Sequence, residues 1–139
     1  MNASSPQTLS GRAYVFSSWS DGKGQIHDIV TAASPSTYTA TFKACTKTGT
    51  SGADVFDGAS GADVICGLGG DDRIGGFGGD DILEGMGGND TLRGGGADTV
   101  KGGAGADSLY GENGNGALNS QDGVSGNDTL DGGPAQTAT

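Results

Sequence analysis

The sequence has few of the residues that build an ordinary globular core. Only 32% of its 139 residues are hydrophobic and 6% are aromatic, whereas 30 are glycine. No apolar run approaches the length that a membrane-spanning helix needs, so we expect no membrane span. Low hydrophobicity with high net charge is typical of disordered chains. A chain that is disordered without a metal and folded with it has the same composition.

Positive charge is scarce and unevenly placed. The formal net charge is −10, with −12 in residues 49–131 and +2 in residues 1–48. A nucleic-acid partner is disfavoured, because phosphate binding needs a basic patch. The acidic segment instead needs cations to become compact.

Cysteine and histidine are rare as well. Cys45 and Cys66 are the two cysteines, and the sequence leaves open whether they form a disulfide outside the cell or remain free thiols. His27 is the single histidine, and no pattern around it indicates a Ser/His/Asp triad. No Gly-Lys-Ser/Thr follows the glycines, so they are not phosphate loops. We therefore expect no catalytic residue and no enzyme.

The segment before residue 49 predicts a small antiparallel β-domain that is incomplete. Residues 1–11 are expected to be a flexible N-terminus, without the apolar core of a signal peptide. Strands are predicted at 12–19, 25–31 and 36–44, and the third alternates between Tyr38, Ala40, Phe42 and intervening polar residues. Three strands are near the minimum for independent stability. The module of residues 12–44 therefore needs strands from upstream sequence, from the repeats or from another molecule.

Two runs in this module resemble the closing strands of β-sandwich-like modules on secreted bacterial proteins. The first run is Phe16-Ser17-Ser18-Trp19-Ser20-Asp21-Gly22, and the second is Tyr38-Thr39-Ala40-Thr41-Phe42. The resemblance covers about thirty residues. It implies a module attached to an exported protein.

Residues 49–131 repeat every nine residues, after a short junction at 45–48 and before a tail at 132–139. The unit Gly67-Leu68-Gly69-Gly70-Asp71-Asp72-Arg73-Ile74-Gly75 follows the pattern G-G-x-G-x-D-x-U-x, in which U is a large apolar residue. Ser120-Gln121-Asp122 is inserted before the last repeat, and one residue is deleted in repeat 94–101. The nine U residues are Phe56, Ile65, Ile74, Leu83, Leu92, Val100, Leu109, Leu118 and Leu130. Such regularity is not expected of a random glycine-rich linker.

This repeat resembles that of the RTX (repeats-in-toxin, hemolysin-type) family, which binds calcium. The resemblance implies an all-β fold, a right-handed parallel β-roll with two repeats per turn of the coil, and Ca²⁺ between stacked turns. The oxygen ligands suit a hard cation of flexible coordination better than they suit Mg²⁺ or Zn²⁺. The implied side-chain ligands are Asp54, Asp63, Asp72, Asp81, Asp90, Asp98, Asp107 and Asp128. Glycines expected to contribute backbone oxygens are Gly58, Gly67, Gly69, Gly76, Gly78, Gly85 and Gly87.

By analogy with the family, we expect roughly three to six ions. The best sites are predicted between repeats 1 and 3, 2 and 4, and 3 and 5. The sites between repeats 4 and 6 and between repeats 5 and 7 rank next, and the one-residue deletion leaves their geometry undetermined. Sites of 6 and 8 and of 7 and 9 are doubtful; Gly116 replaces the aspartate of repeat 8, and three inserted residues precede repeat 9. Affinities on the order of 10⁻⁴ to 10⁻³ M, as in extracellular modules, would leave the chain unfolded inside a cell and folded outside.

These patterns favour a secreted, extracellular calcium-binding module that folds on Ca²⁺ and stabilises, or helps to secrete, a larger parent exoprotein. The alternative is a self-assembling subunit of an extracellular filament or surface layer, in which like subunits share calcium and donated strands. An enzyme with its active site in residues 1–48 ranks last, because this segment offers no catalytic constellation.

Overall fold

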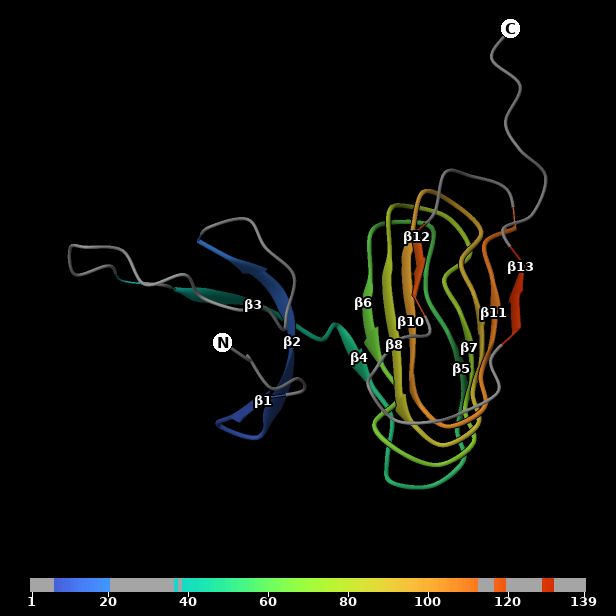
Figure 1. The fold of residues 1–139 in the computed structure, drawn as a ribbon, viewed down its shortest axis with the longest axis horizontal. Coiled ribbons are helices and arrows are strands. Elements are labelled where there is room, and N and C mark those ends of the chain that lie inside the picture. Colours follow the sequence, from blue (N-terminus) through green and yellow to red (C-terminus); the bar gives the residue numbers. More distant parts are fainter. Residues whose placement is uncertain (1–6, 21–36, 38, 113–116, 120–128, 132–139) are drawn as a thin grey trace, which may run out of the picture. The chain divides into compact units, whose positions relative to one another are not determined.

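The computed structural model describes residues 7–20, 37, 39–112, 117–119 and 129–131, and among them every regular element is a strand. The chain divides into two compact units, Met1–Ala44 and Cys45–Thr139 (Figure 1). No described helix is long and apolar enough to cross a membrane. Each unit is described by itself below.

The first unit is a three-stranded antiparallel sheet in the order β1-β2-β3. Its strands are β1 (Gln7–Leu9), β2 (Arg12–Trp19) and β3 (Ala40–Ala44). The Phe16 ring lies 6.0 Å from that of Trp19 and 6.1 Å from that of Phe42, which forms the small aromatic core. Strand β1 lies where the sequence predicted a flexible N-terminus, since three of its residues pair with β2. The strand predicted at 25–31 lies outside the described residues.

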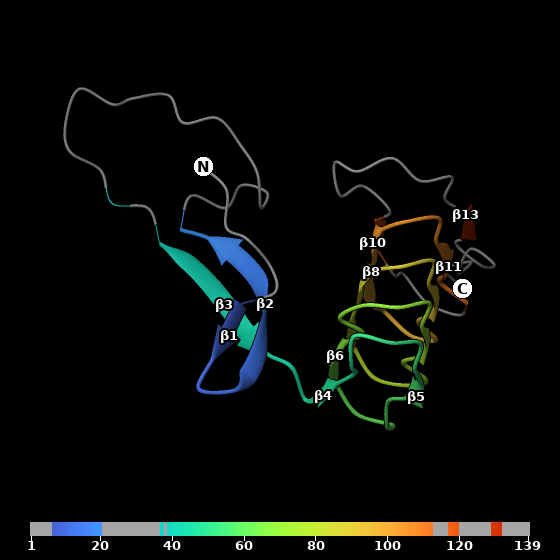
Figure 2. The ribbon, with the colours of Figure 1, turned by 90° about the horizontal axis from the view of Figure 1, so that it is seen from below.

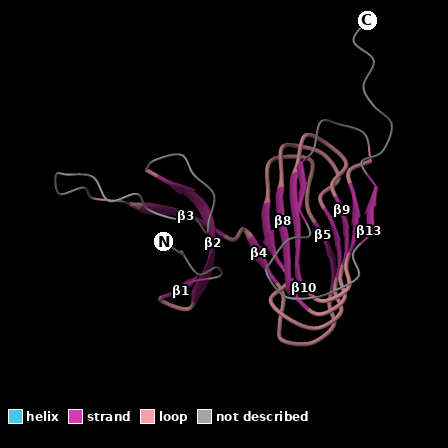
Figure 3. Cartoon of the chain, viewed as in Figure 1, coloured by secondary structure: helices cyan, strands magenta, loops and turns pink. Residues whose placement is uncertain are grey.

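The second unit is a parallel β-roll, as the repeat predicted. One sheet has the order β12-β10-β8-β6-β4 and the other β13-β11-β9-β7-β5, so successive repeats alternate between the two (Figures 1 and 3). The first sheet contains β4 (Lys47–Thr48), β6 (Val64–Cys66), β8 (Ile82–Gly87), β10 (Thr99–Ala104) and β12 (Ala117–Asn119). The second contains β5 (Val55–Asp57), β7 (Arg73–Gly75), β9 (Thr91–Arg93), β11 (Ser108–Tyr110) and β13 (Thr129–Asp131).

The U residues form the interior of the roll. Strand register aligns Ile65, Leu83 and Val100 in one sheet and Phe56, Ile74, Leu92 and Leu109 in the other. Six of these seven are buried, and Phe56 packs against them. Burying such a side chain contributes about 1.5–3 kcal/mol. The coils seen in Figure 2 therefore stack because each adds two apolar residues to the same columns.

The N-terminal end of the roll differs from the predicted junction. Residues Lys47–Thr48 form strand β4, which pairs with β6 so that Lys47 lies opposite Ile65. Lys47 thus occupies a U position, and its Nζ donates a hydrogen bond to the carbonyl of Asp57. Cys45 forms a disulfide with Cys66, and their Cα atoms are 6.1 Å apart. The Lys47 charge in the column of U residues and the disulfide together end the roll on this side and disfavour the addition of a further coil.

Candidate metal centre

The aspartates at position six of the repeats lie in two columns, one along each row of turns. One column contains Asp54, Asp72, Asp90 and Asp107, and the other contains Asp63, Asp81 and Asp98. In each column, Oδ1 of one aspartate accepts a hydrogen bond from the backbone N–H of the aspartate one coil earlier, at 2.8–2.9 Å. These bonds link neighbouring coils and fix the orientation of each carboxylate.

The aspartates differ in whether their second carboxylate oxygen, Oδ2, accepts a hydrogen bond. The Oδ2 atoms of Asp72, Asp81 and Asp90 are buried and accept no hydrogen bond within the described part of the chain. Each of these side chains is 1% exposed. Leaving a buried polar atom without a hydrogen-bond partner costs roughly 1–3 kcal/mol, and a charged oxygen costs more. These three buried oxygens therefore need a positive partner.

Backbone carbonyls converge on the same places. The first glycine of a turn has no side chain, and in five turns the space that a Cβ would take is bordered by oxygens of two coils; these are the turns of Gly49, Gly58, Gly67, Gly76 and Gly85. At Gly67 that Cβ would lie 2.3 Å from Asp72 Oδ2 and 2.7 Å from the carbonyl oxygen of Gly85. At Gly85 it would lie 2.2 Å from Asp90 Oδ2 and 2.5 Å from the carbonyl oxygen of Gly102. A carboxylate and a carbonyl from the next coil thus face the same point.

The same arrangement recurs at the other glycines predicted as ligands. Gly76 has Asp81 Oδ2 at 2.6 Å and the Gly94 carbonyl at 2.7 Å, and Gly58 has the Gly76 carbonyl at 2.6 Å. Position three is different. A Cβ at Gly69, Gly78 or Gly87 would find backbone atoms nearest, at 3.7–4.0 Å. The position-one glycines therefore lie beside the carboxylates, whereas the position-three glycines lie beside the backbone of neighbouring coils.

Burial raises the pKa of the ladder carboxyls. It raises the pKa of Asp72 and Asp81, opposed by the backbone hydrogen bond that each accepts and helped by neighbouring aspartates. For Asp90 the same causes raise the pKa to about 6. Asp63 behaves oppositely, because hydrogen bonds from the Ala59 N–H and the Thr46 hydroxyl lower its pKa. The buried carboxylates therefore favour a bound positive charge, either a proton or a cation.

The donor set fits calcium. All converging groups are oxygens, from carboxylates and peptide carbonyls, and Ca²⁺ accepts six to eight such ligands in flexible geometry. Among the described residues, no group of three or more His, Cys, Asp or Glu side chains lies close enough to hold a metal by itself. A site in this roll must therefore combine carboxylates with carbonyls of two coils, which is what the position-one glycines provide.

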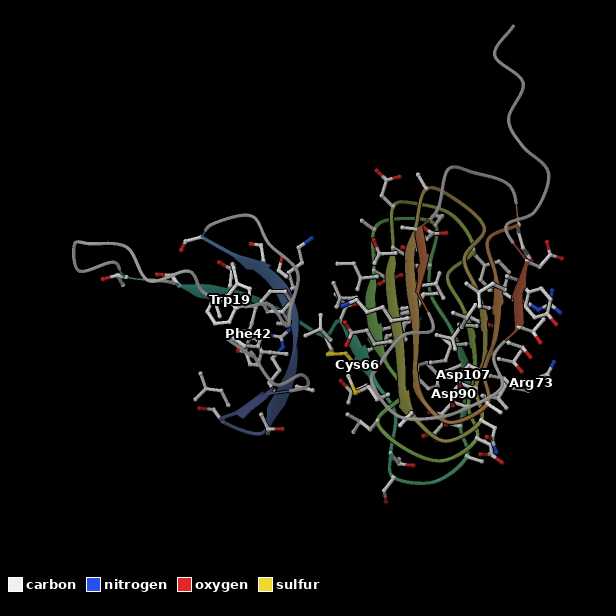
Figure 4. All side chains as sticks on the ribbon, viewed as in Figure 1. Trp19, Phe42, Cys66, Arg73, Asp90 and Asp107 are labelled. Carbon is white, nitrogen blue, oxygen red and sulfur yellow. A yellow bond between two sulfur atoms is a disulfide. The ribbon has the colours of Figure 1, made fainter. Side chains whose placement is uncertain are left out.

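Three predicted ligands make local hydrogen bonds instead. Oδ2 of Asp54 accepts from the Thr50 N–H at 2.6 Å, Oδ2 of Asp63 from Ala59 at 2.7 Å and Oδ2 of Asp98 from Gly96 at 2.8 Å. Asp107 is 1% exposed and is the last described member of its column. Figure 4 labels Asp90 and Asp107, which lie close together. Asp128 lies outside the described residues.

The sequence analysis missed two threonines that support the first coil. The Thr46 hydroxyl donates to Asp63 Oδ1 at 3.0 Å, and the Thr50 hydroxyl donates to Asp54 Oδ2 at 2.9 Å. Counting the period backward from Asp63 by two repeats places Cys45 and Thr46 at positions six and seven. Lys47 at the next position breaks the apolar rule, which hid this degenerate coil.

Position two of the turns also needs a conformation that the sequence did not reveal. Leu68, Phe77 and Met86 have φ of +80°, +70° and +76°, where Gly95 and Gly103 of later repeats have φ above +100°. This left-handed region disfavours residues with a Cβ. The stacked turns therefore hold the backbone of these three residues in a conformation that residues with a Cβ rarely adopt.

Comparison with known proteins identifies the repeat. Four copies of the RTX calcium-binding nonapeptide repeat match residues 48–74, 75–98, 94–115 and 122–134, which together span more than half of the chain. No curated protein and no solved structure matches the sequence.

Proposed function

This chain belongs to the family of RTX calcium-binding nonapeptide repeats, and from that membership we propose that its roll folds on binding Ca²⁺ outside the cell and stabilises an attached exoprotein. The observation that carries the proposal is the repeated pairing of a buried carboxylate oxygen with a carbonyl of the next coil, as at Asp72 and Gly85. The proposed role is structural rather than enzymatic.

Charge couples folding to the ion. Coiling brings Asp72 beside Asp54 and Asp90, since each Oδ1 accepts a hydrogen bond from the N–H of the aspartate one coil earlier, so carboxylates accumulate in two columns. A bound calcium ion supplies positive charge and accepts oxygen ligands. The apolar columns then pack without that repulsion, and the fold contributes its burial energy to cation binding. Since only the coiled chain brings these oxygens together, affinity and folding are one equilibrium.

The disulfide and the acidic composition support an extracellular role. Disulfides form and persist in oxidising compartments, and Cys45 and Cys66 are bonded and buried in the first coil. Oxygen sites of extracellular modules bind calcium on the order of 10⁻⁴ to 10⁻³ M, which is too weak for the cytosol. We propose that the roll stays unfolded before export and folds afterwards, which aids secretion of its parent protein.

A calcium titration tests this function. The chelated chain should lack the β-sheet signal of the roll in circular dichroism, and millimolar calcium should restore it in a cooperative transition. Magnesium at the same concentration is the control and should be far less effective, because it demands octahedral geometry and releases water reluctantly. A full β-sheet signal in the chelated chain at neutral pH would exclude coupled folding.

A second candidate is a subunit of a calcium-dependent filament or surface layer. Two exposed leucines favour it: Leu9 on the edge strand β1 is 67% exposed and Leu130 on the last strand β13 is 49% exposed. Lys47 in the apolar column opposes stacking at the other end of the roll. Sedimentation velocity at rising concentration, with calcium present, distinguishes the two. A monomer at the highest concentration counts against assembly.

A further inference from the structure

We infer that the cation sites formed by the described residues of this roll are of two kinds, with strong sites at Asp72, Asp81 and Asp90 and weaker sites at its first coil and at the shortened turn. The inference rests on the proposed function, since it concerns which carboxylates the ion needs. It is carried by the hydrogen bonds of the second carboxylate oxygen, Oδ2.

The strong sites belong to the turns that end at Asp72, Asp81 and Asp90, here called the cation-dependent turns. In each, Oδ2 is buried without a hydrogen-bond donor in the described part of the chain. In each, a carbonyl of the next coil, from Gly85, Gly94 or Gly102, faces the same space beside the first glycine. Since none of the described residues donates a hydrogen bond to this oxygen, a cation gains the full interaction with the carboxylate.

The weaker sites belong to the turns that end at Asp54, Asp63 and Asp98, here called the self-bonded turns. Oδ2 of Asp54 accepts both the N–H and the hydroxyl of Thr50, and Oδ2 of Asp63 accepts the Ala59 N–H. A cation must compete with these bonds for the carboxylate. A hydrogen bond to a charged group contributes about 1.5 kcal/mol or more, so we expect roughly tenfold weaker binding at these turns.

The one-residue deletion accounts for the third self-bonded turn. Asp98 is 3% exposed and still joins its column, since its Oδ1 accepts the Asp81 N–H at 2.9 Å. Its Oδ2, however, accepts the N–H of Gly96, only two residues earlier. In the first coil the corresponding donor lies four residues earlier. Shortening therefore closes this turn on its own aspartate, while its Gly94 carbonyl still faces Asp81.

This division reorders the sites that the sequence ranked. The pairs of repeats 1 and 3 and of 2 and 4 were expected to be the best, together with 3 and 5. The hydrogen bonds instead favour 3 and 5, 4 and 6, and 5 and 7, which contain Asp72, Asp81 and Asp90. Calcium is then bound first in the middle of the roll, and the first coil is supported by Thr46, Thr50 and the disulfide.

Equilibrium dialysis of the full, oxidised chain against calcium tests the inference. The wild-type chain should bind calcium in two classes of site, whose affinities differ about tenfold. The variants are Asp90→Asn and Asp98→Asn, which are matched because both aspartates are buried and each accepts at Oδ1 the backbone N–H of the aspartate one coil earlier. Asparagine retains that acceptor and removes the charge at Oδ2. We expect one strong ion fewer than in the wild type with Asp90→Asn, whereas Asp98→Asn should lose a weak ion and keep the wild-type number of strong ones.

Loss of a strong ion in Asp98→Asn, or no loss in Asp90→Asn, would overturn the inference. If Asp90→Asn does not fold at accessible calcium concentrations, the wild-type count decides, and a single class of equal sites, whatever their number, contradicts it. These outcomes differ from failure of the proposed function, in which the wild-type chain binds no calcium at millimolar concentration.

Discussion

Replacing a core leucine, which supplies no side-chain ligand, should weaken the apparent calcium affinity. Leu92 is fully buried in β9 and lies in register between Ile74 and Leu109. Leu92→Ala removes its packing against these neighbours, and such truncations cost 2–5 kcal/mol. The narrow columns of a roll relax little, so we take about 3 kcal/mol as the loss.

That loss converts into a shift of the calcium midpoint. If three ions bind only the folded roll, each tenfold change in free calcium changes the folding free energy by about 4 kcal/mol. A loss of about 3 kcal/mol is then offset by roughly fivefold more calcium. The expected result is a midpoint about fivefold higher, with an unchanged number of bound ions and an unchanged final spectrum.

The assay is a calcium titration followed by far-ultraviolet circular dichroism. Val55→Ala is the matched control, because Val55 lies on a strand of the same sheet but is 77% exposed, and its midpoint should move by less than twofold. Leu92→Ala with a wild-type midpoint and a lower melting temperature would show that the roll forms independently of calcium. That result would refute coupled folding.

Three further predictions follow from the same contacts. Burial raises the pKa of Asp90 to about 6, above its ordinary value of 3.8, so folding takes up protons. Without calcium, the chain should therefore form more of the roll near pH 4 than at pH 7.5, and this gain should be lost as pH rises through about 6; an equal β-sheet signal in circular dichroism at the two pH values would contradict this. Reducing the Cys45–Cys66 disulfide, whose cysteines are separated by 21 residues, should cost about 3 kcal/mol, and chemical denaturation with calcium present should show it. Gly70→Ala should destabilise the roll by about 2 kcal/mol or more, because φ is +97° and the new Cβ would lie 2.4 Å from the Gly52 carbonyl carbon, whereas Gly61→Ala, with nothing within 4 Å, should be tolerated in a parallel thermal melt.

Much of the fold follows from the nine-residue period. A glycine-rich turn and a short strand of fixed length bring residue 65 over residue 83 whatever lies between them, so the period predicts the parallel sheets and the columns of U residues. It also predicts the columns of aspartates, and Asp98 keeps its place despite the deletion because strand pairing sets the register. In a repeat protein, the conformation of one repeat therefore also sets which residues of neighbouring coils are in contact.

What the sequence by itself determined is thus the coil, its apolar interior and the lines along which carboxylates gather. Only the tertiary structure decided which oxygens of Asp90 and Asp98 have donors, that Cys45 pairs with Cys66, and that Lys47 ends an apolar column. The physical reason is that a repeat pattern gives each residue a position in the coil, whereas a hydrogen bond depends on the placement of one atom relative to another. A one-residue change in turn length moves a donor into or out of reach without altering the period around it.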